Sequence, residues 1–321
     1  MPLTFPTAEE LAQAAQVVYA VVPPTPQYAW PLLEERIGTQ VWIKHENHTP
    51  TGAFKIRGGL TYFAKLRDID PTCAGVITAT RGNHGQSIGL AARRHGLPAT
   101  IVVPLGNSIE KNAAMRALGV ELIEHGVDFQ DARELVSVLA KERSLHPVPS
   151  FHHDLLSGVA TYSVEFLRAV PKLDVVYVPI GLGSGICGMI VARAALRHGV
   201  EIVGVVADAA PAYALSFSAK RPIEHAVSTL LADGLACRAT DHSALELIIA
   251  NVSRIVRVTD VEIAHAMRIL YTDTHNLAEG AGAAGFAAIM QERDRLKGKC
   301  VGTVMTGGNV DLEIFRNAVA I

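Results

Sequence analysis

The chain has 321 residues, of which 49% are hydrophobic and 19% are charged, and its formal net charge is −2. This composition is typical of a globular protein of about two domains and excludes an intrinsically disordered chain. It contains no run of Lys or Arg that would bind a nucleic acid or an anionic membrane surface, so we expect small molecules and further copies of the chain as partners.

The predicted elements alternate between short β-rich runs and helical stretches. They are, in chain order, a strand at 41–45, a helix from about 53, a strand at 75–79, a helix at 83–95, a strand at 100–104, a helix to about 118, a strand at 120–124 and a helix at 128–144. After a break at 147–154 follow a strand at 175–180, a helix at 185–198, strands at 201–207 and 254–259, a helix at 260–271 and a strand at 301–305 that leads into a final helix. This alternation indicates βαβ units and parallel sheets, and the break favours two sheets.

The cysteines and the N-terminal segment favour a cytoplasmic protein. The chain has four cysteines that lie far apart and form no Cys-x-x-Cys pair, so neither a zinc site nor a disulfide framework is predicted. The N-terminal segment lacks the basic start and apolar core of a signal peptide. We interpret the apolar stretch 175–194, which contains glycines, as a buried strand and a helix and not as a membrane span.

Parallel sheets bind ligands in the loops that follow the C-terminal ends of their strands. Three such loops are unusual, namely 82–85, 181–185 and 306–309, and a fourth segment, 51–55, lies at a predicted helix start. The glycines of 181–185 follow a strand and open a helix, which is the arrangement of an anion-binding loop. Taken alone, this loop fits a phosphate site and a plain tight turn equally well, and it matches neither a Walker A loop nor a good dinucleotide fingerprint.

A lysine in the first turn of a helix is usually a solvated surface residue, and Lys55 alone would be interpreted so. Its neighbours change that interpretation. The small residues Thr51-Gly52-Ala53 leave room for a ligand, and Phe54 can pack against a flat ring. A lysine in such a pocket loses its proton more easily and can form a Schiff base.

The segment around Lys55 carries a family resemblance. Lys44-x-Glu46-Asn47, followed by Thr51-Gly52-Ala53-Phe54-Lys55-x-Arg57-Gly58, resembles the attachment signature for pyridoxal 5′-phosphate (PLP) in the serine/threonine dehydratase family, which belongs to the fold-type II, tryptophan-synthase β-like PLP enzymes. The other three segments occur in that family's order and spacing, and the resemblance spans about 25–311. It implies an α/β fold with two open, twisted parallel-sheet domains, a large one formed by 1–71 and 151–321 and a small one formed by 72–150, with PLP in the cleft between them. It also implies a homodimer.

The resemblance implies a role for each candidate site residue. Lys55 would carry PLP as a Schiff base and act as the base at Cα, and Phe54 would flank the cofactor ring. Asn83 would bond the pyridine 3-oxygen, and Thr306 would face the pyridine nitrogen. The phosphate would be held by Gly181, Leu182, Gly183, Ser184 and Gly185. The amino-acid substrate would be bound by Thr80, Arg81, Gly82 and His84, with the backbone N–H groups of the loop on its carboxylate.

The hydroxyl of Thr306 has a consequence for the reaction. A carboxylate at this place would keep the ring nitrogen protonated and make the ring a strong electron acceptor, whereas a neutral hydroxyl cannot. Expulsion of a β-leaving group then competes better with transamination. We therefore expect dehydration and deamination of a β-hydroxy-amino acid, such as L-threonine or L-serine, to a 2-keto acid and ammonia.

Arg81 is the most informative departure from the family pattern. Serine racemases have a serine here that acts as the second base, and arginine stays protonated and cannot do so, which argues against a racemase. Either Arg81 contacts a substrate group beyond the α-carboxylate, as in 3-hydroxyaspartate, phenylserine or a hydroxylated diamino acid, or it points outward and pairs with a surface acid. A third alternative is a non-enzymatic protein that holds PLP or senses amino acids. The presence of Lys55, Asn83 and Thr306 argues against it.

No metal site is predicted. Some family members bind a divalent cation through a carboxylate near the position of Val206 or Ala212, and neither of these side chains can coordinate a metal. The histidines at 84, 152 and 153 do not have a ligand spacing. Asp233-Gly234 and Glu279-Gly280 resemble loops near the family's active site, and the sequence assigns neither of them a direct role.

Overall fold

The computed structural model describes residues 6–320, which contain two separate β-sheets. The six-stranded sheet has the order β1-β2-β10-β7-β8-β9, and the four-stranded sheet has the order β5-β4-β3-β6. The strands are β1 (Gln27–Ala29), β2 (Val41–His45), β3 (Val76–Ala79), β4 (Ala99–Val103), β5 (Glu121–Glu124), β6 (His146–Pro147), β7 (Val175–Pro179), β8 (Glu201–Ala207), β9 (Arg254–Val258) and β10 (Val301–Met305). All strand pairs are parallel except β1 with β2, so an antiparallel edge strand is added to the predicted parallel sheets.

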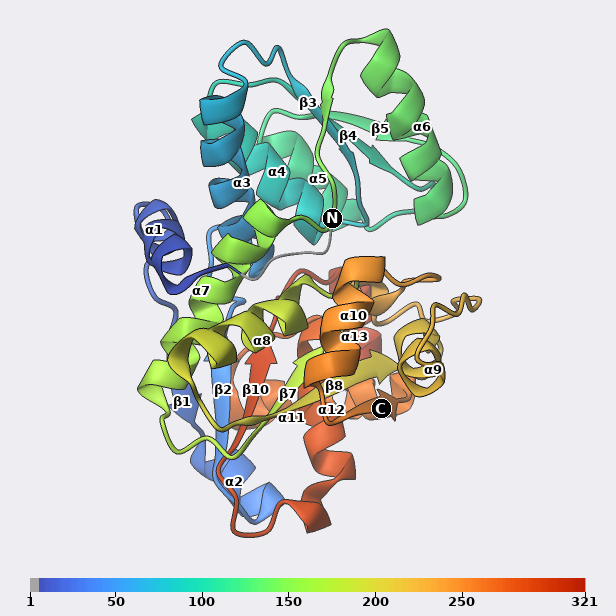
Figure 1. The fold of residues 1–321 in the computed structure, drawn as a ribbon. Helices are drawn as coiled ribbons and strands as arrows, with labels where there is room; N and C mark the ends of the chain where they lie inside the picture. Colours follow the sequence, from blue (N-terminus) through green and yellow to red (C-terminus); the bar gives the residue numbers. More distant parts are fainter. Residues whose placement is uncertain (1–5, 321) are drawn as a thin grey trace.

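Helices cover both faces of each sheet (Figure 1). They are α1 (Ala8–Tyr19), α2 (Pro31–Ile37), α3 (Lys55–Ile69), α4 (Asn83–Arg94), α5 (Ile109–Ala117), α6 (Phe129–Glu142), α7 (His153–Ala169), α8 (Ser184–Leu196), α9 (Ala212–Ala219), α10 (His242–Asn251), α11 (Asp260–Thr274), α12 (Gly280–Gln291) and α13 (Leu312–Val319), with short 3₁₀ turns η1 (Asp233–Leu235) and η2 (Arg293–Arg295). No helix within 6–320 is long and apolar enough to cross a membrane.

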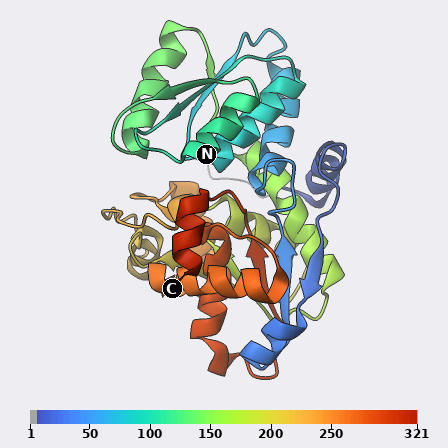
Figure 2. The ribbon, with the colours of Figure 1, turned by 180° about the vertical axis from the view of Figure 1, so that it is seen from behind.

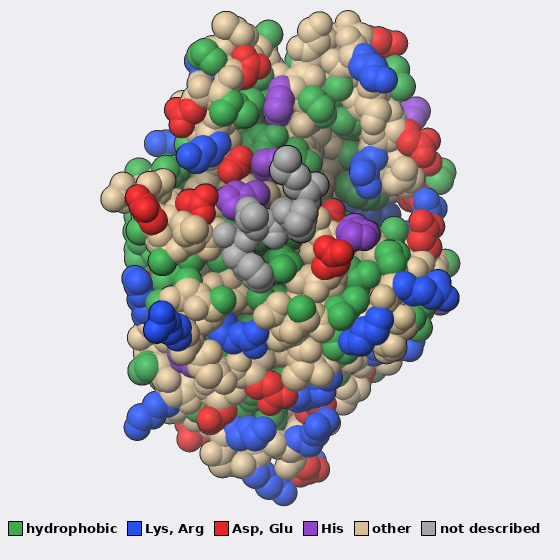
Figure 3. Space-filling view, viewed as in Figure 1, with side chains coloured by type: hydrophobic (Ala, Val, Ile, Leu, Met, Phe, Trp, Pro, Cys, Tyr) green, Lys and Arg blue, Asp and Glu red, His purple; other side chains and the backbone are tan. Residues whose placement is uncertain are grey.

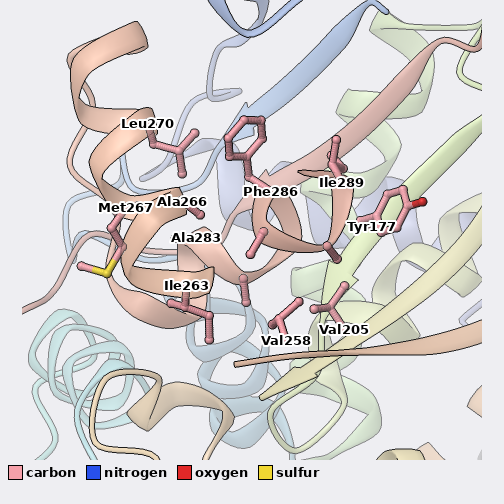
Figure 4. Packing of buried hydrophobic residues seen from close by; sticks show 14 of the residues in the cluster. Tyr177, Val205, Val258, Ile263, Ala266, Met267, Leu270, Ala283, Phe286 and Ile289 are labelled. Atoms are coloured by element: carbon pink, nitrogen blue, oxygen red, sulfur yellow. The ribbon is translucent and has the colours of Figure 1, made fainter. Parts of the chain in front are cut away.

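The large sheet lies between two hydrophobic layers. In β7 and β8 nearly every residue is buried, which is why these strands read as continuous apolar runs and not as alternating patterns. On one face, α11 and α12 pack on the strands, and Figure 4 shows Met267 and Phe286 of these helices near Val205 and Val258. On the other face the core is formed with α7, α8 and α10.

The small sheet is also covered on both faces. One cluster contains residues of α3, α4 and α5, such as Phe63, Ile88 and Met115, and the other contains Ala132 and Val136 of α6. Figures 1 and 2 show this sheet and its helices as a lobe above the large sheet. We propose that the lobes are the domains 1–71 with 151–321 and 72–150, because every strand of each sheet falls inside its own segment.

The structure differs from the prediction in several elements, and the helices α1, α2, α7, α9, α10 and α12 were not predicted. The helix expected from about 53 begins at Lys55, because residues 51–54 form turns and a bridge between Ala53 and Gly307. The break expected at 147–154 ends in the start of α7, where a ring nitrogen of His152 accepts from the backbone of Asp154 and caps the helix. The short strands β1 and β6 were not predicted. Helix α7 packs against both α3 and α8 and so joins the two lobes.

Candidate active site

A cleft lies between the lobes, where β3, β7 and β10 end at their C-terminal sides. It encloses about 890 Å³, its opening to solvent included. All the candidate residues line it, namely Phe54, Lys55, Thr80, Arg81, Gly82, Asn83, His84, Gly181, Leu182, Gly183, Ser184, Gly185 and Thr306. On the face drawn in Figure 3, acidic and basic side chains are interspersed over both lobes.

Lys55 begins α3, and its amine faces the start of α8. The Nζ atom lies 2.9 Å from Oγ of Ser184 and 5.0 Å from the centre of the Phe54 ring. Desolvation by the surrounding protein lowers the pKa of Lys55 to about 8, although Cys237 and Glu279 act in the opposite direction. With this pKa a larger fraction of Lys55 is a neutral amine near neutral pH than of an ordinary lysine, although most of it is still protonated, and the neutral amine is the form that attacks a carbonyl carbon.

The glycine-rich loop between β7 and α8 turns its carbonyl groups into the protein. The Leu182 carbonyl accepts a hydrogen bond from the Tyr213 hydroxyl (2.8 Å), and that of Gly185 accepts one from Tyr162 (3.1 Å). Gly183 is the N-cap of α8 and has a φ of +107°. The first N–H groups of a helix have no partner within it, so this end of α8 is suited to bind an anion.

We predict that Gly183→Ala weakens cofactor binding. A Cβ here would lie 2.7 Å from the Cβ of Ala244, and the positive φ is unfavourable for any side chain. Displacing this backbone costs about 1–3 kcal/mol, so the dissociation constant for PLP should rise about tenfold or more. Fluorescence titration of the apoprotein with PLP measures this. Gly199→Ala is the control, since Gly199 has no neighbour within 4 Å, and equal affinities of the two variants would contradict the prediction.

The loop before α4 retains only some of its N–H groups for a ligand. The Thr80 hydroxyl accepts hydrogen bonds from the backbone N–H groups of Gly82 (2.9 Å) and Gly85 (3.2 Å). Those two amides, and the Thr80 side chain, are thus engaged within the loop. The structure gives no acceptor within 6–320 for the amides of Arg81, Asn83 and His84, and these remain for a carboxylate.

Arg81 and His84 each present a polar atom without a partner. The Nε atom of Arg81 and the Nε2 atom of His84 are buried, and neither has a hydrogen-bond partner within 6–320. Burial, together with the charge of Lys55, lowers the pKa of His84 to about 3, so its ring is neutral. Arg81 forms no ion pair in the described part of the chain and lines the cleft. The outward orientation toward a surface acid, which the sequence left open, is therefore not what the structure shows.

A polar network at the base of the cleft was largely missed from the sequence. The Asn83 side chain donates to Glu279 (2.6 Å) and accepts from Asn309 (2.8 Å). Lys111 of α5, which the sequence did not single out, forms an ion pair with Asp233 (2.6 Å). No sequence signal marks Lys111, because its partner is 122 residues away along the chain.

Three charged residues of the attachment signature, Lys44, Glu46 and Arg57, lie behind the cleft and do not line it. Arg57 forms ion pairs with Glu46 (2.7 Å) and Glu165 (2.6 Å), and Lys44 forms one with Glu165 (2.6 Å). Arg57, Glu46 and Lys44 are fully buried, and Glu165 is nearly so. This network ties β2 and α3 to α7, so this part of the signature supports the helix that carries Lys55.

The residues present fit PLP. The start of α8 offers unpaired N–H groups for a phosphate, and the Lys55 amine can bond an aldehyde. Phe54 is buried beside it, and Thr306 lines the cleft with its carbonyl held by the Phe54 N–H (3.1 Å). Within 6–320 no group of three or more His, Cys, Asp or Glu side chains is arranged to hold a metal ion. Together the fold and the cleft define an α/β enzyme that carries a phosphorylated cofactor on a lysine.

Comparison with known proteins agrees with this class. The chain belongs to the pyridoxal-phosphate dependent enzyme family, whose model matches residues 18–307. It is 33% identical over 312 residues to an L-threonine ammonia-lyase of Thermotoga maritima, covering 96% of this chain and 77% of the relative. It is 31% identical over 316 residues to an L-threo-3-hydroxyaspartate ammonia-lyase of Saccharomyces cerevisiae, covering 98% and 97%. The structure of maize serine racemase superposes with a TM-score of 0.90 at 26% identity, covering 99% of this chain and 98% of that one. The predicted family, fold and PLP cofactor are thus confirmed.

Proposed function

We propose that this chain catalyses the β-elimination of a β-hydroxy-amino acid, with L-threonine and L-serine as the first substrates to test and a 2-keto acid and ammonia as products. The observation that carries the proposal is the position of the Lys55 amine, 2.9 Å from Ser184 at the head of α8, in a cleft that also contains the Thr306 hydroxyl. The two relatives named above are ammonia-lyases, which supports the same reaction class.

In the proposed mechanism the chain binds the cofactor phosphate and the substrate carboxylate and moves one proton. When bound, PLP supplies the electron-withdrawing ring that makes the Cα proton of the substrate acidic. The start of α8 holds the phosphate, and the amides of Arg81, Asn83 and His84 hold the substrate carboxylate. The neutral Lys55 amine would remove the Cα proton, and the hydroxyl group would leave Cβ with its bonding electrons and take up that proton, so that water is released and the amine is regenerated. The resulting enamine takes up water and yields the keto acid and ammonia. A positioned base of this kind contributes about 10²–10⁴-fold to the rate.

The test of this function is the stoichiometry of the products. The holoenzyme is incubated with L-threonine, L-serine and 3-hydroxyaspartate, and keto acid and ammonia are assayed separately. Equal amounts of the two from at least one substrate are expected. A protein that binds PLP and releases neither product from any of these substrates would rule out the proposed function.

Arg81 favours a second candidate, in which the substrate carries a further anionic or bulky polar group, such as 3-hydroxyaspartate, phenylserine or a hydroxylated diamino acid. Arg81 lines the cleft without a counter-ion in the described residues, and Lys55 lines the same cleft. A planar guanidinium binds a carboxylate through two parallel hydrogen bonds. The site therefore has the charge to bind a second carboxylate.

We predict that Arg81→Ala changes the substrate preference. A charged hydrogen bond contributes about 1.5–3 kcal/mol, so kcat/KM for 3-hydroxyaspartate should fall about tenfold or more relative to that for threonine. Steady-state kinetics on both substrates measures this, with Arg116→Ala as the control, since Arg116 pairs with Glu124 at the surface. Unchanged relative rates would contradict a substrate-binding role for Arg81.

Racemisation is the less favoured alternative. It requires two bases on opposite sides of Cα, and Arg81 remains protonated and cannot be the second one. The likeness to maize serine racemase is a likeness of fold. Chiral analysis of unreacted substrate separates the two activities, because a racemase accumulates the D-enantiomer.

We further propose that the protein is a cytoplasmic homodimer. The four cysteines at 73, 187, 237 and 300 are free thiols, which is usual for proteins of a reducing compartment. Sedimentation of the purified holoenzyme determines the oligomeric state.

A further inference from the structure

Lys111 connects the two lobes at the base of the cleft. It belongs to α5, beside the small sheet, and its amine lies 2.6 Å from Asp233 and 3.4 Å from Glu279, both of which belong to the large-sheet lobe. Lys111 and Glu279 are buried, at 4% and 2% exposure. Burial favours the neutral amine, yet the two carboxylates raise the pKa of Lys111 above its usual value, so this lysine is charged.

The two oxygens of Glu279 face different groups. Oε2 has no hydrogen-bond partner within 6–320 and lies nearest to the charge of Lys111. Oε1 accepts from the side-chain amide of Asn83 at 2.6 Å. Burial raises the pKa of Glu279, and the ammonium group of Lys111 acts against this rise. Lys111 thus favours the carboxylate form of Glu279, which can only accept hydrogen bonds.

The amide of Asn83 is therefore fixed at both ends. Its nitrogen faces Glu279, because an ionised carboxylate can accept a hydrogen bond but cannot donate one. Its oxygen accepts a hydrogen bond from the side-chain amide of Asn309. That amide of Asn309 also donates to the carbonyl of Thr51 (2.8 Å). A side-chain amide has two N–H bonds, and only one of them is used by Glu279. Since Asn83 lines the cleft, the second N–H remains for a ligand in it.

We propose that Lys111 is a positioning residue: its ion pairs with Asp233 and Glu279 hold the Asn83 amide so that it presents an N–H, and not its oxygen, to the ring oxygen of PLP. The same side chain fills the space next to Gly82, where any Cβ would overlap its methylene groups. Lys111 therefore contacts both the network that orients the Asn83 amide and the backbone at Gly82, the residue before Asn83. Without the ammonium group of Lys111, nothing at this position offsets the effect of burial, which favours the protonated form of Glu279, and that form can donate and no longer dictates the orientation of the amide.

The test uses the visible absorbance of the holoenzyme, because the yellow band belongs to the form of the cofactor with an ionised ring oxygen. A hydrogen bond to a charged group is worth about a factor of ten, so Lys111→Met should lower the ratio of yellow to near-ultraviolet absorbance about tenfold and raise the dissociation constant for PLP by a similar factor. Lys111→Arg should restore most of the ratio, and Arg116→Met, on the same helix but in an exposed pair with Glu124, should leave it unchanged.

A purely structural role predicts a different result. It would lower the melting temperature of Lys111→Met while the spectrum and the PLP affinity stay as in the wild type, and that result would overturn the proposal. Should Lys111→Met not fold, Glu279→Gln replaces it, because the glutamine can donate as well as accept, and a wild-type spectrum for that variant would equally overturn the proposal. The readouts need bound PLP but no turnover, so they are independent of the proposed substrate.

Discussion

Replacing Lys55 by alanine is expected to abolish the elimination activity, with a loss larger than about 10⁴-fold in kcat. The reason is that one side chain has two tasks: it bonds the cofactor and it removes the Cα proton, and the second task alone is worth about 10²–10⁴-fold. No other amine can take over, since Lys111, which also lines the cleft, is held by Asp233 at 2.6 Å and stays charged.

The measurement is keto-acid release by the purified variant in the presence of excess PLP. Lys65→Ala is the matched control, because Lys65 lies on the same helix with an exposed side chain. The control should keep wild-type activity. If Lys55→Ala retained more than about one per cent of the wild-type rate, the loss would be smaller than the lower limit of about 10²-fold for a single positioned base, and the assignment of Lys55 as the base would be wrong.

The second large effect is expected on stability. Arg57→Met should lower the free energy of unfolding by about 3–5 kcal/mol, because it leaves the Glu46 carboxylate buried without its cation and removes one of the two partners of Glu165. Lys44 remains beside Glu165 at 2.6 Å but does not reach Glu46 in the structure. The helix that begins with Lys55 should also become less firmly held, so weaker PLP binding is expected to accompany the loss of stability.

Urea denaturation followed by circular dichroism measures this change. Arg143→Met is the control, since Arg143 pairs with Glu121 at the surface, where both side chains are about half exposed, and such pairs contribute at most about 1 kcal/mol. Equal losses for the two variants would mean that the buried network behind the cleft does not stabilise the fold.

Much of the fold could be predicted because its central strands are largely apolar. The predicted ranges of β2, β8 and β10 agree with the structure, and those of β7 and β9 differ by one residue. The central strands β7, β8 and β10 are buried on both faces, and β7 and β10 precede glycine-rich loops, so their limits are marked in the sequence. The edge strand β1 has three residues and the bridge-like β6 has two, which is too short for any pattern. Helix α7 was not predicted, and its start carries no usual signal because its cap is a histidine and not one of the usual capping residues.

The candidate site could be predicted as far as it depends on strand ends. Asn83, Gly181 and Thr306 come from loops that follow β3, β7 and β10, and such loops meet at one edge of parallel sheets. What could not be predicted are contacts between the lobes. Lys111 reaches Asp233 across 122 residues of sequence, and the engagement of Thr80 with its own loop depends on a local turn that no residue pattern specifies. The sequence therefore located the cleft and left open which polar atoms are free in it.

The most direct test of the central claim is to find the residue that carries the cofactor. The holoenzyme is reduced with borohydride, digested and analysed by mass spectrometry, with Lys55→Ala treated in parallel. We expect the reduced PLP adduct on the peptide that contains Lys55 and on no peptide of the variant. An adduct on a different lysine, or none on a protein that has bound PLP, would contradict the account.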